Sequence, residues 1–350
     1  MSVSEREGRI LGIIETARAK RPRFKDERIT MAHGAGGKAT QTLIEGLLAP
    51  AFGLEELADA ALVDGYALTT DSFVVKPLRF PGGSIGELAV NGTVNDLAMA
   101  GARPLALSLA LILEEGLDAA VLRAEVEAIA TAADRAGVRI AAGDTKVVER
   151  GHADGMYVCT TGVGARDARA ALSPDAIRPG DRVLVSGPIG EHGTAIMLAR
   201  GDLGLDADVQ SDTRSLWPAV DAMLSGGVHC LRDATRGGVA SVLNELARAA
   251  RVGVVVREAD VPVEPAVAGA AELLGIDPMY VANEGKFVAF VAPGAADAAL
   301  TALRTVEGCE RAAEIGEVRE EPPGMVLVET AFGGRRVMDQ LVGDPLPRIC

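Results

Sequence analysis

The alternation of apolar and polar residues predicts a mixture of strands and helices in the first half of the chain. The apolar runs 104–113 and 156–163 have the length and composition of buried strands. Residues 118–136 carry apolar side chains at helical spacing, and 138–142 form a further apolar run of strand length. Residues 60–75 predict two shorter strands joined by a tight turn. Strands and helices are therefore interleaved, as in α/β and α+β proteins.

The second half repeats this mixture. Apolar runs predict strands at 181–186, 253–257, 287–292, 312–318 and 325–329. Helical spacing predicts helices at 190–200, 213–225, 238–251, 265–274 and 295–306. A chain of 350 residues is long enough for two domains. We therefore expect an N-terminal extension with a glycine-rich strip at 1–45, domains at 46–165 and 166–335, and a mobile tail at 336–350.

Composition and charge argue against several classes of protein. The formal net charge of −14 argues against a nucleic-acid surface, which requires clustered Lys and Arg. No apolar run reaches the ~18–20 residues of a membrane-spanning helix, and the first residues lack the apolar stretch of a secretory signal. The four cysteines show no C-x-x-C spacing, which argues against a zinc site or a disulfide framework. We expect a cytoplasmic protein with neither a nucleic-acid nor a membrane partner.

A glycine-rich strip at 29–38 precedes the first expected helix. It ends in Gly-Gly-Lys but does not form a P-loop, because Ala32 and Ala39 stand where that motif needs Gly and Ser or Thr. The strip remains rich in backbone N–H groups, which can fold over phosphates. A plain linker before the helix is the alternative interpretation.

Four aspartates lie at expected loop or strand-end positions: Asp71, Asp96 and Asp144 in the first half, and Asp233 in the second. Carboxylates without a Cys/His cluster suit Mg²⁺, which binds through a few carboxylates together with substrate phosphates. Taken singly, each aspartate is more typical of a helix cap or a surface group.

A helix is expected to begin at Ser84, which forms an S-x-x-E capping box with Glu87. This helix carries Asn91, Asn95 and Asp96 among apolar residues. Such polar groups are costly to bury without partners, so a metal or a ligand would explain them. An exposed polar face is the competing explanation.

The chain ends on a thiol, Cys350. Pro345 and Pro347 favour an extended arm that could present this thiol to another protein and then return it to a pocket. A frayed terminus that happens to end in Cys is the alternative.

Five motifs, in this order, resemble the PurM-like ATP-binding superfamily of aminoimidazole ribonucleotide synthetase. They are His33-Gly34-Ala35-Gly36-Gly37, Thr70-Asp71-Ser72, Val94-Asn95-Asp96-Leu97-Ala98-Met99-Ala100-Gly101, Gly143-Asp144-Thr145-Lys146 and Asp233-Ala234-Thr235-Arg236-Gly237-Gly238. Within that superfamily, the closing Pro347-Arg348-Ile349-Cys350 resembles the HypE family of hydrogenase maturation factors. The resemblance covers about residues 29–350 and leaves 1–28 as an extension of unassigned role.

The resemblance implies a carbamoyl dehydratase that uses ATP and Mg²⁺. A partner carbamoyltransferase would load Cys350, and ATP would drive dehydration of the thiocarbamate to a thiocyanate. The cyano group would then pass to iron on a two-protein maturation scaffold. By matching motifs, the resemblance implies catalytic roles for Cys350, Lys146 and Glu284, nucleotide contacts from Gly34, Gly36, Gly37, Lys38, Asn95, Asp233, Thr235 and Arg236, and metal ligands Asp71, Asp96 and Asp144.

The implied fold is a two-domain α/β (α+β) chain whose N-terminal sheet pairs with that of a second subunit, with a sheet-and-helix C-terminal domain. For Glu284, a salt bridge with Lys286 or Lys146 is the alternative to catalysis. Two other functions stay open. A selenophosphate synthetase would need a reactive Cys in its glycine-rich strip, and residues 29–40 contain none. A nucleotide-binding adaptor would bind ATP without turning it over.

Overall fold

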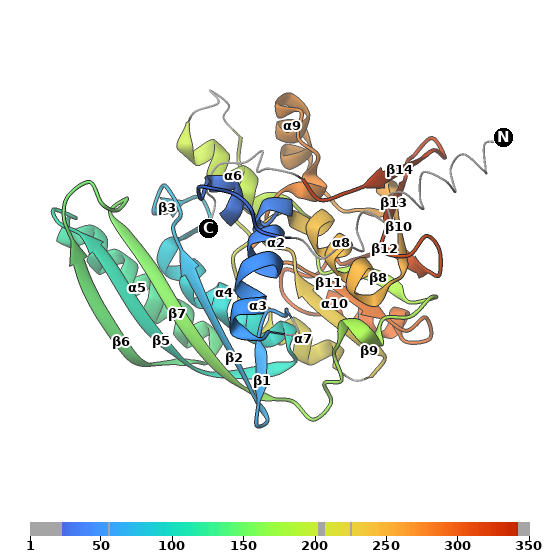
Figure 1. The fold of residues 1–350 in the computed structure, drawn as a ribbon, viewed down its shortest axis with the longest axis horizontal. Coiled ribbons are helices and arrows are strands. Elements are labelled where there is room, and N and C mark those ends of the chain that lie inside the picture. The colour runs from blue at the N-terminus through green and yellow to red at the C-terminus, as the bar shows by residue number, and fades with distance from the viewer. Residues whose placement is uncertain (1–22, 55–56, 202–206, 225, 342–350) are drawn as a thin grey trace.

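The computed structural model describes residues 23–54, 57–201, 207–224 and 226–341. These residues form two main sheets, one five-stranded and one seven-stranded, with helices packed on them (Figure 1). The expected two-domain fold of mixed strands and helices is confirmed. None of the helices in the described ranges is long and apolar enough to cross a bilayer.

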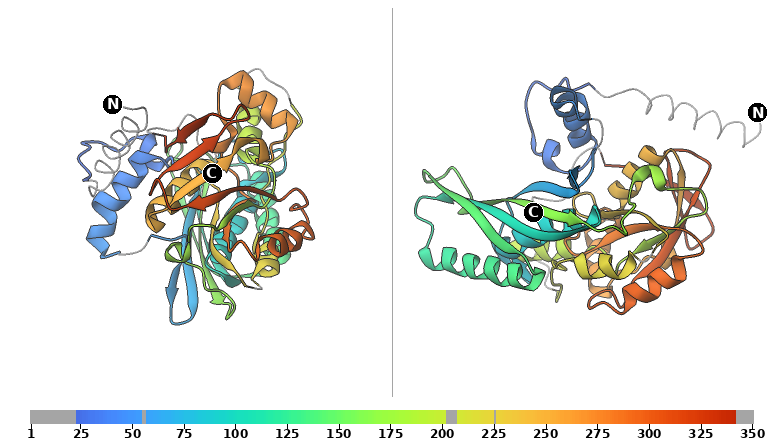
Figure 2. Two further views of the ribbon diagram at one scale, coloured as in Figure 1. Left: turned by 90° about the vertical axis from the view of Figure 1, so that its right-hand side faces the viewer. Right: turned by 90° about the horizontal axis from the view of Figure 1, so that it is seen from below.

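The five-stranded sheet has the order β1-β2-β7-β5-β6. Its strands are β1 Ala61–Val63, β2 Tyr66–Phe73, β5 Ala102–Glu114, β6 Arg139–Val148 and β7 Met156–Arg166. Helices α4 (Ile85–Met99) and α5 (Ala119–Ala136) cover one face (Figure 2). On this face, Val90 and Ile129 share an apolar cluster with Leu107 of β5. The alternating side chains of the strands separate this packed face from the opposite one.

The opposite face of this sheet, which we call the outer face, is covered by no described helix. Ser72, Cys159, Ala110 and Asp144 form one row across it, from β2 to β6. Thr160, the neighbour of Cys159, is buried and donates to the backbone of α4, so this row points the other way. The edge strand β6 is exposed along almost its whole length. Both the outer face and its edge therefore remain open in the single chain.

The seven-stranded sheet has the order β14-β13-β10-β12-β8-β11-β9. Its strands are β8 Arg182–Val185, β9 Val228–Asp233, β10 Gly253–Arg257, β11 Phe287–Val291, β12 Ala313–Arg319, β13 Val326–Glu329 and β14 Arg335–Met338. Its helices are α6 Glu191–Arg200, α7 Trp217–Met223, α8 Gly238–Ala250, α9 Pro265–Leu274 and α10 Ala296–Arg304. One apolar core lies between the sheet and α8, and another lies between its other face and α7 with α10. Because both faces are covered, β11 is buried throughout.

Short elements complete the fold. They are η1 Met31–Gly34, α2 Lys38–Leu43, η2 Ile44–Leu48, α3 Ala49–Phe52, β3 Arg79–Phe80, β4 Gly83–Ser84, η3 Pro174–Ala176, η4 Glu258–Asp260 and η5 Pro278–Tyr280. The helix predicted after the glycine-rich strip is thus confirmed as the continuous run α2, η2 and α3.

Several local expectations differ from the structure. Asp144 is not at a strand end, because β6 continues through it in parallel pairing with β5 as far as Val148. Ser84 does stand at the N-cap of α4, but its side chain makes no capping hydrogen bond and its buried Oγ has no partner. The helix expected at 213–225 begins only at Trp217. Strand β14 crosses the expected start of the tail at 336, because it pairs with β13.

Candidate functional site

The ends of strands from both sheets bring acidic side chains together. Asp233 is the last residue of β9, opposite Phe287 of β11, so Glu284 in the turn before β11 lies beside it. On the first-domain side of the boundary between the sheets, Thr69 of β2 donates to Asp96 of α4 with an Oγ1–Oδ2 distance of 2.8 Å. The same hydroxyl lies 2.8 Å from the carbonyl oxygen of Asp59. We call Asp59, Asp71, Asp96, Asp233 and Glu284 the acidic cluster.

The carboxylates of this cluster repel one another, because they are buried close together and carry the same charge. Burial raises the pKa of Asp96 well above its ordinary value, and the charges of Asp233, Asp59 and Asp71 raise it further. Burial and then Asp59 raise the pKa of Asp233 in the same way. Burial, followed by Asp71 and Asp233, raises the pKa of Glu284 well above the ordinary value. Without a cation, these groups therefore favour the protonated state.

Arginines provide part of the compensating charge. Arg232 pairs with Asp59 at an Nη1–Oδ1 distance of 2.8 Å and links β9 to the first domain. The charge of Arg236 lowers the pKa of Asp71 and of Glu284, although burial prevails for both. The cluster keeps an excess of acidic groups, which is the environment that attracts a divalent cation.

The donor set suits Mg²⁺, because it consists of carboxylate oxygens. However, no three acidic, His or Cys side chains in the described ranges already stand as a complete ion-binding group. Mg²⁺ commonly takes only a few protein carboxylates and completes its shell with waters and substrate phosphates. The cluster therefore fits a cation that arrives with a phosphate ligand better than a permanently held ion.

The glycine-rich strip lies against the start of α8. Arg236 donates from Nη1 to the carbonyl oxygen of Gly34 at 2.9 Å. Gly36 has a φ of +77°, and a Cβ placed there would lie 2.8 Å from the carbonyl oxygen of Arg236. Gly237, the N-cap of α8, also has a positive φ of 77°. The strip and the Asp233-to-Gly238 turn thus pack closely, next to the acidic cluster.

The chain leaves β14 beside this strip. Lys38 pairs with Asp339 at an Nζ–Oδ2 distance of 2.9 Å, and its backbone N–H donates to the carbonyl oxygen of Leu341 at 3.0 Å. Lys38 thus anchors the root of the tail through both groups. Cys350 lies outside the described residues, and the intervening stretch can span at most ~30 Å. A site beside the strip is within that reach.

Asn95 proves to be fully engaged by protein. Its Nδ2 donates to the carbonyl oxygens of Arg214 at 3.0 Å and of Glu284 at 3.1 Å. Its Oδ1 accepts from the N–H of Leu216 at 2.7 Å. Through these bonds α4 holds the second domain, and the nucleotide contact expected of this amide stays a prediction. A buried amide satisfied by backbone groups explains its position without a ligand.

Asp144 and Lys146 lie apart from the acidic cluster in this chain. They pair with each other at 2.6 Å, and their side chains are 65% and 69% exposed. Asp144 faces the outer side of the sheet, and its strand is separated from β2 by two others. At the usual spacing between strands, Asp144 is ~14 Å from β2.

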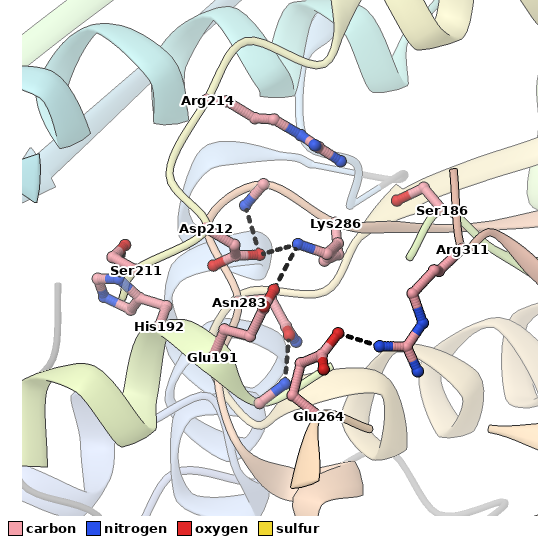
Figure 3. A network of polar contacts seen from close by, with 12 residues as sticks. Ser186, Glu191, His192, Ser211, Asp212, Arg214, Glu264, Asn283, Lys286 and Arg311 are labelled. Carbon is pink, nitrogen blue, oxygen red and sulfur yellow. Dashed lines mark hydrogen bonds and ion pairs between the residues drawn. The ribbon is translucent and has the colours of Figure 1, made fainter. Parts of the chain in front are cut away.

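The salt bridge considered for Glu284 is not formed. Lys286 instead pairs with Glu191 at 2.9 Å and with Asp212 at 3.1 Å (Figure 3). The Glu284 carboxylate has no hydrogen-bond partner among the described residues, although its side chain is almost fully buried. This leaves Glu284 available for proton transfer.

Sequence reasoning missed Asp59, Asp212 and Arg232. A buried lysine at the start of an apolar strand requires a carboxylate partner, so Lys286 signalled that such a partner exists. It did not signal which acid, because Asp212 is 74 positions away in the chain. Asp59 and Arg232 carried no pattern that distinguishes them from surface charges.

The two sheets and the shared site define the class of protein. The chain matches the AIR synthase related protein family, with its N-terminal domain at residues 57–165 and its C-terminal domain at 178–328. It is 48% identical to carbamoyl dehydratase HypE of Rhodobacter capsulatus, over 93% of this chain and 99% of the relative. The chain therefore belongs to the HypE family, the carbamoyl dehydratases of hydrogenase maturation.

Solved structures agree with this assignment. A HypE–HypF complex contains a chain that superposes with a TM-score of 0.83 and 44% identity, covering 85% of this chain and 99% of the other. A HypE structure in complex with ATP has a TM-score of 0.79 and 44% identity, covering 92% of this chain and 100% of the other. The likeness spans both domains.

Proposed function

We propose that this carbamoyl dehydratase binds ATP with Mg²⁺ between the glycine-rich strip, the start of α8 and the acidic cluster. The observation that carries the proposal is the cluster itself, where burial and the neighbouring carboxyl groups raise the pKa values of Asp96, Asp233 and Glu284, so that a bound cation would stabilise their charged forms. Asp71, Asp96 and Asp233 would hold Mg²⁺, which supplies charge neutralisation for the phosphates. The ATP complex of the related HypE supports the choice of nucleotide.

The phosphates would lie on backbone N–H groups at the start of α8 and on the strip. The N-terminus of a helix favours anions, because its first N–H groups are unpaired and the helix dipole is positive there. Gly36, Gly37, Thr235 and Arg236 lie on these two segments. Lys38 would contribute through the tail root it anchors.

The reaction would begin with carbamoyl transfer to the thiolate of Cys350: an S–C bond forms, and the bond between the carbamoyl carbon and its donor on the transferase breaks. The carbonyl oxygen of this thiocarbamate then accepts the γ-phosphoryl group of ATP, and ADP leaves. Loss of the nitrogen-bound protons and of phosphate completes the S–C≡N group. Glu284 would accept a proton, because its raised pKa brings it nearer to neutral pH, where a general base is most effective.

In a homodimer, the two remaining predicted site residues, Asp144 and Lys146, would reach the site of the second copy. The open outer face and the exposed edge β6 carry Asp144 and Lys146. Pairing of two such sheets in a homodimer would cover this surface and carry these residues across the interface. Asp144 as a metal ligand and Lys146 as a proton donor or acceptor are therefore proposed only for the dimer.

The carbamoyltransferase partner would be a HypF protein, as in the complex solved for the related HypE. The acceptor of the cyano group would be iron on a two-protein maturation scaffold. The reaction would take place in the cytoplasm, where a thiol such as that of Cys350 stays reduced.

Phosphate release measured with and without carbamoylation tests the proposal. We expect Mg²⁺-dependent ATP hydrolysis only after HypF and a carbamoyl donor have loaded the chain, with one phosphate per dehydrated group. Turnover that needs selenide instead would indicate the selenophosphate reaction, and nucleotide binding without turnover would indicate an adaptor. Either result would contradict the proposal.

A further inference from the structure

A short segment joins the two domains directly behind Glu284. We call residues 211–216 the strap. The N–H of Ser211 donates to the carbonyl oxygen of Pro81 at 2.8 Å, and Asn91 of α4 donates to the Thr213 hydroxyl at 3.2 Å. The N–H of Leu216 is bound by Asn95. Asn95 also donates to the carbonyl oxygen of Arg214. The strap is therefore held to the first domain by four hydrogen bonds, although it belongs to the second.

Asp212 projects from the strap into the turn that carries Glu284. Its Oδ1 accepts from the N–H of Glu284 at 3.0 Å, and its Oδ2 accepts from the N–H of Gly285 at 3.1 Å. The Asp212 side chain is 2% exposed. A Cβ on Gly285 would lie 1.9 Å from the carbonyl oxygen of Asp212, so only glycine allows this approach. The Asp212 carboxylate thus accepts hydrogen bonds from two consecutive backbone N–H groups.

The other side of Glu284 is held by the first domain. Asn95 donates to the Glu284 carbonyl oxygen at 3.1 Å. The N–H and the C=O of Glu284 are therefore both fixed, while its carboxylate remains unpartnered among the described residues. Fixing the backbone on both sides restricts the directions in which the side chain can point.

We propose that Asp212, together with Asn95, is a positioning residue that directs the Glu284 carboxylate toward the other members of the acidic cluster when the two domains are in contact. The proposal rests on the proposed role of Glu284 as the proton acceptor. Asp212 touches no reacting atom in this account and acts only through the backbone of Glu284.

The chain offers a matched control. Glu191 and Asp212 both pair with the buried ammonium of Lys286 (Figure 3). Only Asp212 also binds the Glu284 turn. Glu191→Gln and Asp212→Asn therefore each remove one negative charge that pairs with Lys286. Only Asp212→Asn also weakens the hydrogen bonds to the Glu284 turn. A purely structural role of this network would give both variants the same loss of turnover.

The test measures dehydration turnover and Mg-ATP affinity of the full chain, loaded with carbamoyl by its transferase. We expect Asp212→Asn to lower kcat by about 10–100-fold, since small misplacements of a catalytic group have effects of that size. Mg-ATP affinity should change by less than about twofold, and Glu191→Gln should lower kcat by less than about threefold, because neither the nucleotide site nor the Glu284 turn is touched.

A double variant separates this proposal from the role of Glu284. In a Glu284→Gln background, Asp212→Asn should cause no further loss of kcat, because its effect passes through the missing carboxylate. A further loss equal to that in the native background would overturn the positioning role. Full activity of Glu284→Gln would instead overturn Glu284 as proton acceptor, and with it the proposal that rests on it. If Asp212→Asn does not fold, Asn95→Ala gives the same comparison from the other side.

Discussion

At the scale of single residues, buried acidic groups make the free protein sensitive to pH. In the unfolded chain, Asp233 titrates near ~3.9, whereas in the folded chain burial and Asp59 raise its pKa well above that. Between those two pKa values the folded state binds more protons, so the free energy of unfolding falls as pH rises through this window. Asp96 and Glu284 act with the same sign.

Asp233→Asn should remove this penalty. Without nucleotide, we expect the variant to unfold about 2–4 °C higher at mildly alkaline pH, the shift that ~1 kcal/mol produces in a domain of 150–250 residues. The gain should fade at acidic pH, where Asp233 is protonated in both states. Thermal unfolding at several pH values measures this. Glu127→Gln on the exposed side of α5 is the control and should leave the unfolding midpoint unchanged at every pH. A lower midpoint for Asp233→Asn at alkaline pH would contradict this prediction.

Asp71→Asn should weaken Mg-ATP binding at least tenfold, or by about 1.4 kcal/mol, while leaving the fold intact. The reason is that Asp71 lies in the acidic cluster, where its charge acts on Asp96, Asp233 and Glu284. Calorimetry with Mg-ATP gives the affinity, and thermal unfolding checks the fold. Unchanged affinity in a folded variant would exclude Asp71 from the site.

The sequence already pointed to most of these residues. Asp71, Asp96, Asp233 and Glu284 stood out by their motifs, and the fold couples them electrostatically. Asn95 also stood out, but its amide is used by backbone groups, which no sequence pattern could reveal. The reason is that a polar residue on an apolar helix looks the same whether its partner is a ligand or another segment of chain.

At the scale of elements, the packing of the glycine-rich strip on α8 depends on Gly36. Gly36→Ala would meet the carbonyl oxygen of Arg236 and would need a left-handed backbone that alanine disfavours. We expect at least tenfold weaker Mg-ATP binding, measured by calorimetry, because the strip must move away from the α8 N-terminus. Gly269→Ala is the control, since its Cβ would meet nothing within 4 Å. Equal affinities of the two variants would contradict a role for the strip.

Elements with strong periodicity were predictable, whereas the strap was not. The pattern at 213–225 predicted a helix, yet α7 starts at Trp217. The backbone of the preceding residues bonds instead to Asn95 and to the first domain. Tertiary hydrogen bonds between domains thus replace helical ones, and they cannot be read from local spacing. The same limitation explains Asp144, whose strand continues because β5 pairs with it.

At the scale of the whole molecule, the outer face predicts association of two chains. Thr161→Arg would place a long charged side chain at the centre of this face, beside Thr70. We expect this variant to sediment as a monomer at concentrations where the native chain is a dimer. Val126→Arg, on the exposed side of α5, should not alter assembly. A native chain that sediments only as a monomer would contradict the interface.

The dimer also decides the role of Asp144. Asp144→Asn should weaken Mg-ATP binding in the dimer, because the residue would then reach the site of the other copy. In the Thr161→Arg background, the same change should have no effect, since Asp144 stays on the far face of its own sheet. Calorimetry on the four variants of this cycle measures the coupling. An equal loss in both backgrounds would place Asp144 in the site of its own chain.

The terminal thiol of Cys350 is expected to carry the reacting group. Two of the other cysteines are poor candidates: Cys230 and Cys309 are buried, and burial raises the pKa of Cys230 to about 12, which suppresses its reactive thiolate. Cys159 lies on the outer face, in contact with Ser72. Cys350 lies outside the described residues, and its place after Pro345 and Pro347 predicts an extended arm that could reach both a partner and the site.

Peptide-resolved mass spectrometry after incubation with a carbamoyl donor, the transferase and Mg-ATP tests this claim most directly. We expect the peptide ending in Cys350 to gain a carbamoyl group and then to lose one water, which leaves a cyano group. Cys350→Ala should gain neither group while retaining Mg-ATP binding. A carbamoyl or cyano group found on Cys159, Cys230 or Cys309 instead would contradict it.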